Sequence, residues 1–312
     1  MPHFQPLMPK IVDSERLGSA AIPRHMPMTT PEMREQTVAR TGGQPLLGHP
    51  GESNPYIDYQ FVDLLLSLQY PRSSGYDEMC FIVMGQVKEL LFKGLHFELY
   101  NAREQIRNDC VSEALDILHR AREYARYITE SWDVLSTIST DGFNQFRDFL
   151  GTASGQFSFM YRHVEFILGN KNARLARAHS NVPHIWPAME QALTSRSLYD
   201  EVIALLARRG YNISSQALER DWSEEYRHDE SVEAAWLDVY KDPIPKNEIY
   251  RLGESLCALA DQISQYRWRH FVSVERIIGF KPGTGGSAGV QWLRNVVDHR
   301  FFPELWTMRT KM

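Results

Sequence analysis

The stretch that decides the fold is IYRLGESLCALADQISQYRWRHFVSVERIIGF, residues 249–280. Its apolar residues recur at alternating spacings of three and four, which places their side chains on one face of an α-helix. The stripe consists of Ile249, Leu252, Leu256, Leu259, Ile263, Tyr266 and His270. The pattern predicts a long helix over about residues 246–279 that packs against other helices.

His270 occupies a position of this stripe where a leucine would be expected. One interpretation is a neutral core histidine whose two ring nitrogens are both hydrogen-bonded. The other is a ligand to a metal or to haem iron, because an imidazole in the core of a helix bundle is a common axial ligand. The residue pattern alone leaves both open.

Helical patterns run through most of the chain after residue 53, and few stretches show the period of two that is typical of strands. The pattern predicts further helices over about 57–69, 77–107, 111–137, 142–149, 197–209 and 214–240, and one that ends near 168. Asp77 is the expected cap of the second, and Thr140 or Asp141 that of the fourth. Residues 1–53, rich in Pro, Gly, Met and Thr, predict an N-terminal arm with one short helix near 30–40. We therefore expect an all-α fold, with this arm followed by one helical domain over 54–312.

Composition excludes several classes of protein. The net charge of −5, from 34 basic and 39 acidic residues, gives no reason to expect nucleic acid as a partner. No apolar run is long enough to cross a membrane, and the first residues lack the pattern of a secretory signal. Three widely spaced cysteines predict neither a disulfide framework nor a zinc site. A cytoplasmic protein fits these features best.

Gly85 interrupts the large apolar residues of FIVMGQVKELLFK, residues 81–93. Glycine inside a helix costs about 1 kcal/mol relative to alanine, so its presence calls for a reason. Close contact with another helix is one reason. A ligand that needs the space is another.

The Gly-rich segment GFKPGTGGSAG, residues 279–289, follows the long helix. It is no phosphate-binding loop, because such a loop has Lys and then Ser or Thr after its last Gly and is preceded by a strand. The alternatives are a loop that closes over a small ligand, with Thr284 as its polar group, or a plain helix-terminating loop.

Two arginines lie in aromatic surroundings, and each has a structural and a functional interpretation. Arg147, in GFNQFRDFLG, has Asp148 as a neighbouring carboxylate, and Arg162, in FSFMYRHVEF, has Glu165 three residues later. Each arginine could pair with that neighbour. Alternatively, Arg147 could hold the carboxylate of an amino-acid ligand through two parallel hydrogen bonds.

Over roughly residues 56–305 the chain resembles the tryptophan 2,3-dioxygenase family of haem enzymes. Six blocks carry the resemblance: YIDYQFVDLL, DEMCFIVMGQVKELLFK, SWDVLSTI, FRDFLGTASG, YRHVEFILGNKN and RHFVSVERIIGFKPGTGGSAGV. The resemblance implies a bundle of long helices around non-covalently bound haem b, with O2 as co-substrate and an indole amino acid as substrate. It also implies a homotetramer in which the N-terminal arm takes part.

The resemblance implies two sets of site residues. In the haem set His270 is the axial ligand and Arg162 the partner of a propionate; the set is His270, Trp132, Ser154, Gly155, Arg162, Tyr266 and Trp292. In the substrate set Arg147 clamps the carboxylate and Thr284 contacts the amino-acid group; the set is Arg147, Thr284, Phe81, Phe143, Leu150, Tyr56, Tyr59 and Gln60. The family donates aromatic residues at the positions of Tyr56 and Tyr59 to a neighbouring subunit.

Gly85 is the main departure from the family pattern, because tryptophan dioxygenases carry a distal histidine at that position, hydrogen-bonded to the indole N–H. The change removes this acceptor and opens space. We therefore expect first a monooxygenase that inserts one oxygen atom at indole C2 of a tryptophan derivative, such as a β-substituted one, to give a 2-oxindole. The second hypothesis is a dioxygenase that cleaves the C2–C3 bond of L-tryptophan to N-formylkynurenine. The third is a non-catalytic haem sensor of an aromatic ligand, which the matching Arg147 and Thr284 argue against.

Overall fold

The computed structural model describes residues 28–46 and 54–312, and within these ranges it contains helices and no strand. The described residues fall into two compact units, one made of 28–46 with 54–70 and the other of 71–312. The smaller unit contains α2 (Pro31–Thr41), α3 (Pro55–Gln60) and α4 (Val62–Leu65). The expected all-α fold is confirmed for this part of the chain.

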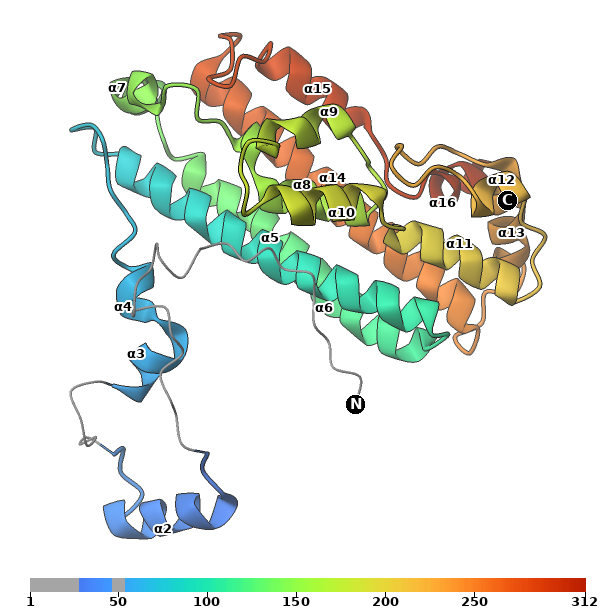
Figure 1. Cartoon of the computed structure of the whole chain (residues 1–312), viewed down its shortest axis with the longest axis horizontal. Coiled ribbons are helices and arrows are strands. Elements are labelled where there is room, and N and C mark those ends of the chain that lie inside the picture. The colour runs from blue at the N-terminus through green and yellow to red at the C-terminus, as the bar shows by residue number, and fades with distance from the viewer. Residues whose placement is uncertain (1–27, 47–53) are drawn as a thin grey trace. The chain divides into compact units, whose positions relative to one another are not determined.

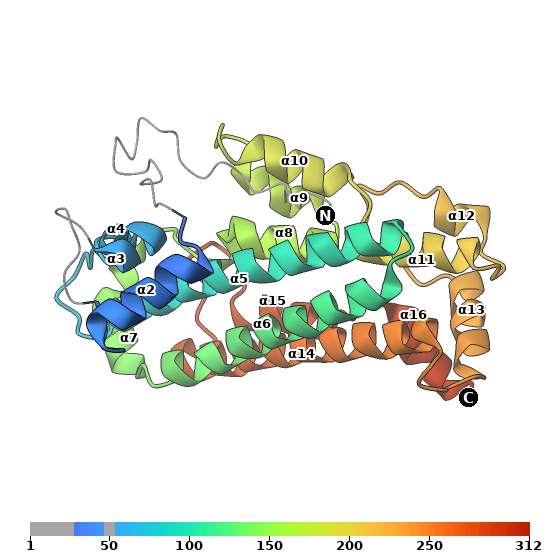
Figure 2. The same cartoon turned by 90° about the horizontal axis from the view of Figure 1, so that it is seen from below.

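The larger unit contains long helices and shorter ones packed beside them (Figures 1 and 2). The α-helices are α5 (Glu78–Arg107), α6 (Val111–Leu135), α7 (Thr140–Arg147), α8 (Phe159–Ile167), α9 (Ala173–Ala176), α10 (Trp186–Thr194), α11 (Leu198–Arg208), α12 (Ser215–Leu218), α13 (Glu230–Tyr240), α14 (Glu248–Ile278), α15 (Val290–Asp298) and α16 (Pro303–Thr307). Single 3₁₀ turns are η2 (Asp148–Leu150), η3 (Gly155–Phe157), η4 (Arg177–His179) and η5 (Met308–Thr310).

Helices α5, α6 and α14 form the centre of this unit. α5 and α6 make an antiparallel pair, joined by a short turn in which Asp109 has φ 65°. α14 lies along α6 in the same direction, and Gln262 Nε2 donates a hydrogen bond to Thr129 Oγ1 between them at 3.0 Å (Figure 2). The predicted stripe on α14 is buried from Ile249 to Tyr266, and its apolar burial supplies the main driving force for this packing.

The helix predictions near 30–40, 77–107, 111–137, 197–209 and 246–279 are confirmed to within a few residues. A single helix over 214–240 is wrong: the Asp229 carboxylate accepts from the backbone N–H groups of Ser231 and Val232 and starts α13 as a new helix. A single helix over 57–69 is also wrong, because Phe61 has φ 52° and separates α3 from α4. The cap at Asp77 is wrong as well, since its side chain makes no capping hydrogen bond.

Two further boundaries differ from expectation. α7 is capped by Ser139, whose hydroxyl accepts from Gly142 N–H at 2.9 Å, so the helix begins before the predicted residue 142 and ends at Arg147. α10 lies in a segment for which the pattern predicted no helix. Its proline occupies the first turn, where the missing N–H breaks no helical hydrogen bond.

Two glycines of α5 give a matched test of packing. A methyl group at Gly94 would overlap the ring of Tyr124 on α6, whereas one at Gly85 would meet nothing within 4 Å. We expect Gly94→Ala to destabilise the haem-free protein by about 1–3 kcal/mol through overpacking. Gly85→Ala should instead stabilise it by about 0.5–1 kcal/mol, because alanine favours the helix. Urea unfolding of both variants is the measurement, and equal stabilities would contradict the packing described here.

Candidate active site

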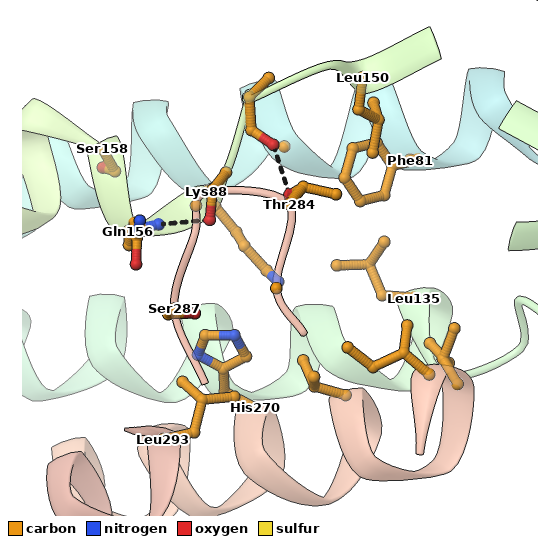
Figure 3. Close-up of a pocket in the computed structure, with 18 of the residues that line it drawn as sticks. Phe81, Lys88, Leu135, Leu150, Gln156, Ser158, His270, Thr284, Ser287 and Leu293 are labelled. Atoms are coloured by element: carbon orange, nitrogen blue, oxygen red, sulfur yellow. Dashed lines mark hydrogen bonds between the residues drawn. The ribbon is translucent and has the colours of Figure 1, made fainter. Parts of the chain in front are cut away.

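A cavity lies where the N-terminal half of α5 meets the C-terminal ends of α6 and α14 (Figure 3). The Gly-rich loop after α14 and residues 153–158 complete its wall. The cavity is lined by most of the residues assigned from the sequence: Phe81, Gly85, Trp132, Phe143, Arg147, Leu150, Ser154, Gly155, Tyr266, His270, Thr284 and Trp292. Residues of α5, α6, α7, α14 and α15 and of the loops beside them therefore converge on one site.

Arg162 does not line this cavity. Its side chain is buried and paired with Glu165, and Glu165 Oε1 is also 2.8 Å from an Nη atom of Arg267 on α14. Of the interpretations offered for Arg162 from the sequence, the structure thus shows the ion pair with Glu165, three residues later. Arg162 stands behind the cavity wall, where its Nη2 donates to the carbonyl of Gln156 at 3.4 Å.

Tyr56, Tyr59 and Gln60 belong to α3 in the smaller unit. The side chains of Tyr56 and Tyr59 are 63% and 74% exposed. Large exposed aromatic residues on one short helix are typical of a surface that another element covers.

The imidazole of His270 faces the cavity from α14 and stacks on Trp132, with ring centroids 4.6 Å apart and planes 14° apart. Burial, together with the nearby Lys88, lowers the pKa of His270 to about 3, so the ring is neutral at physiological pH. No hydrogen bond to either ring nitrogen is found within the described residues. The first interpretation of this residue, a core histidine with both nitrogens satisfied, is therefore wrong, and a lone pair is available to a ligand.

The Gly-rich loop is tied to the opposite wall by three hydrogen bonds, two of which are drawn in Figure 3. Thr284 Oγ1 donates to Ala153 O at 2.7 Å, Gln156 Nε2 donates to Gly285 O at 2.7 Å, and Arg147 Nη2 donates to Pro282 O at 2.6 Å. A side chain at Gly285 would come within 2.8 Å of Ser154 Cβ, so this close approach requires glycine. The loop thus lies over the cavity.

Arg147 has no carboxylate partner within the described residues, although Asp148 follows it directly. Neighbouring residues on a helix point in different directions, which explains why this pair does not form. Most of the guanidinium's N–H groups are left for a ligand. Phe81, Phe143 and Phe146 pack against one another beside it, with ring centroids 5.1–6.1 Å apart. A cation next to an apolar wall suits an aromatic molecule that carries a carboxylate.

Comparisons with known proteins agree with this site. The family model described as tryptophan 2,3-dioxygenase matches residues 48–186 and 181–312. The tryptophan 2,3-dioxygenase of Burkholderia pseudomallei (strain 668) is 44% identical over 261 residues, which is 84% of this chain and 85% of that protein. That of Burkholderia ambifaria (strain MC40-6) is 41% identical over 293 residues, 94% of each chain. This chain belongs to the tryptophan 2,3-dioxygenase family.

Tryptophan 2,3-dioxygenases are haem-dependent oxidoreductases, and the cavity can be tested for its fit to haem. A haem needs an axial ligand, an apolar wall and partners for its two carboxylates. His270 supplies an unbonded neutral imidazole. Trp132 supplies an indole N–H that is buried without a hydrogen-bond partner within the described residues. These donors, unsatisfied by the chain itself, fit the group.

Lys88 is a lining residue that the sequence did not reveal. It lies one turn after Gly85 on α5 and is 8% exposed, and Figure 3 shows its side chain reaching into the cavity between α5 and His270. Its Nζ lies 3.0 Å from the ring centroid of Trp132, with no carboxylate partner in the described part of the chain. Burial holds the pKa of Lys88 well below its usual value. An anionic group that enters the cavity would favour the protonated form of this amine.

Gly85 has open space around it in this structure. A Cβ there would have no neighbour within 4 Å, so close helix packing is not the reason for this glycine. The residue lines the cavity and leaves room in it. The ionisable groups nearest to it along the helix are Lys88 and Glu89, and burial raises the pKa of Glu89. None of the described helices is both long and apolar enough to cross a membrane.

Proposed function

We propose that this chain is a haem-dependent dioxygenase of L-tryptophan or a closely related indole amino acid, and that it cleaves the C2–C3 bond to give an N-formylkynurenine. The observation that carries the proposal is the unpaired guanidinium of Arg147, which faces the same cavity as the unbonded imidazole of His270. The names of relatives that align over most of their length support dioxygenation. Dioxygenation is therefore preferred here to monooxygenation, whereas Gly85 alone favoured monooxygenation.

Arg147 would bind the substrate carboxylate, and the Thr284 hydroxyl would contact the amino-acid backbone as part of the Gly-rich loop. Phe81, Phe143 and Leu150 would surround the indole ring. The loop's hydrogen bonds to residues 153 and 156 would keep it closed and exclude water from the reacting atoms. The protein's part in the reaction is thus to orient the indole and hold it in a dry site.

His270 would hold haem iron, Lys88 and Trp132 Nε1 would face the haem carboxylates, and Tyr266 and Trp292 would pack beside it. When bound, haem would supply the iron that activates dioxygen. The structure thus suggests a different propionate partner from the expected Arg162, whose charge is already paired with Glu165.

Monooxygenation to a 2-oxindole is the second candidate, and the open space at Gly85 favours it. Without an imidazole at this position the indole N–H lacks the acceptor that holds the ring in one orientation. Looser control of the ring could end the reaction after transfer of one oxygen atom. The same space could admit a β-substituent on the substrate.

The product distinguishes the two reactions. We expect purified haem-loaded enzyme, with a reductant and O2, to add two oxygen atoms to L-tryptophan; a product with one added oxygen atom would contradict dioxygenation. Gly85→His should lower KM for L-tryptophan about three- to tenfold, the value of one hydrogen bond, but not for 1-methyltryptophan, which lacks the N–H. An equal effect on both substrates would show that the new side chain acts only by filling space.

The clamp can be tested with a substrate that lacks a carboxylate. Arg147→Ala should reduce kcat/KM for L-tryptophan by about 10- to 100-fold, because a charge-assisted hydrogen bond pair is lost. Turnover of tryptamine, already weak, should not change further. An equal loss on tryptamine would mean that Arg147 serves the loop through Pro282 rather than the substrate.

Haem binding can be tested separately from activity. We expect His270→Ala to lose haem on purification; a fully loaded variant with unchanged absorption spectrum would contradict its role as ligand. Lys88→Met should weaken hemin binding by about 10-fold or more but leave binding of hemin dimethyl ester, which lacks both charges, unchanged. Lys93→Met, an exposed lysine on the same helix, is the control. Equal weakening for hemin and its ester would rule out carboxylate pairing by Lys88.

We further propose a cytoplasmic homotetramer in which α3 presents its aromatic residues to a neighbouring subunit. The exposure of Tyr56 and Tyr59 supports this proposal. Light scattering after size-exclusion chromatography should give four times the chain mass. Tyr56→Ser with Tyr59→Ser should shift the protein to smaller species, and a wild-type monomer would refute the assembly.

A further inference from the structure

A second, small cavity lies between α5, α8 and the C-terminal end of α10, away from the residues that line the candidate active site. Its volume is about 30 Å³. Its ionisable lining residues are His96 and Arg103 from α5, His163 from α8, Lys171 from the segment after α8, and Arg196 from the segment after α10. None of the lining residues is acidic.

Several polar atoms at this cavity are buried without a partner within the described residues. They are both ring nitrogens of His163 and Nδ1 of His96; Nε of Arg196 also lacks a hydrogen bond but lies 3.7 Å from Glu201 Oε1. His163 is 1% exposed and His96 is 4% exposed, and their ring centroids are 5.3 Å apart. A buried polar group without a partner is destabilising by about 1–3 kcal/mol. Such a concentration of polar atoms without hydrogen-bond partners in one place points to a bound species.

Lys171 is the cation here that lacks a counter-charge. Its Nζ donates to the carbonyls of Ala192 at 2.5 Å and Ser195 at 2.8 Å, which leaves one N–H of the ammonium free. The two arginines differ from it: Arg103 is 3.0 Å from Glu104, and Arg196 is 3.7 Å from Glu201. Asp200, whose negative charge raises the pKa of Lys171, is itself paired with Arg220 at 2.8 Å.

We propose that this cavity binds one monatomic anion of the chloride type, held by the ammonium of Lys171 and by an imidazole N–H of His163. The anion would neutralise a buried charge and satisfy one donor on α8 and one on the segment that follows it. It would join α8, which also contributes Tyr161 to the wall of the active-site cavity, to α5 and the end of α10.

The lining disfavours the other possible occupants. Three cations would repel a metal ion, and no group of three metal-binding side chains occurs among the described residues. The cavity volume of about 30 Å³ is that of a site for a water or a single ion, so it favours these over phosphate or a carboxylate metabolite. Below the pKa of about 7 to which burial lowers Lys171, a water alone would leave its ammonium without a counter-ion.

Bromide in place of chloride tests the proposal directly. Crystals of the full-length, haem-loaded protein would be grown at pH 6, below the pKa of about 7 to which burial lowers Lys171, and soaked in bromide. We expect an anomalous bromine peak in the cavity, close to Lys171 Nζ and His163. Density without anomalous signal there, alongside bromide on the protein surface, would identify a water and overturn the proposal.

Thermal unfolding provides an independent measurement. Saturating chloride should raise Tm by about 2–4 °C over gluconate at equal ionic strength, because it binds only the folded state. Lys171→Met and His163→Leu should abolish this difference, whereas His119→Leu, at an exposed position, should retain it. A difference that persists in both cavity variants would place the anion elsewhere. If neither variant folds, the bromide experiment on the wild-type protein still decides.

Discussion

The active-site cavity depends on one constraint, the burial of a continuous stripe along α14 against α6. The stripe fixes the rotation of α14 about its own axis, so the next position on the same face, His270, must point toward the same neighbours. There it meets Trp132 near the end of α6 and stacks on it. Because α5 runs antiparallel beside α6, its N-terminal half, with Phe81, Gly85 and Lys88, is brought to the same place. The cavity is thus a consequence of how three long helices are aligned.

The parts of this arrangement that follow from helical period could be predicted from the sequence. The stripe on α14 and the long helices α5 and α6 are examples, because each repeats the same pattern over many turns. The break at Phe61 and the new helix at Asp229 could not be predicted, since each depends on a single local conformation or capping bond that competes with an otherwise helical pattern. Boundaries are set by such local events, whereas the existence of a long helix is set by many residues together.

The site residues also divide into those that could be predicted from the sequence and those that could not. Arg147 and Arg162 look alike in the sequence, each with a carboxylate close by, but only the spacing of three to Glu165 allows a pair on a helix surface. The spacing could therefore have separated them in advance. Lys88 could not have been found in this way. A lysine in a helix is normally exposed, and its burial here follows from the emptiness around Gly85 and the position of Trp132, neither of which is a property of the local sequence.

Gly85 and Lys88 are best understood together. A histidine at position 85 would fill the space one turn before Lys88, and both side chains would then compete for one part of the cavity. With glycine there, Lys88 has room to reach across toward Trp132. Its amino group therefore lies near the imidazole of His270 rather than near the indole site. Arg147 lines the same cavity and has no carboxylate partner among the described residues. Under the proposed function, Lys88 would face the haem carboxylates and Arg147 the substrate carboxylate, so two separate cations would keep the two kinds of carboxylate apart.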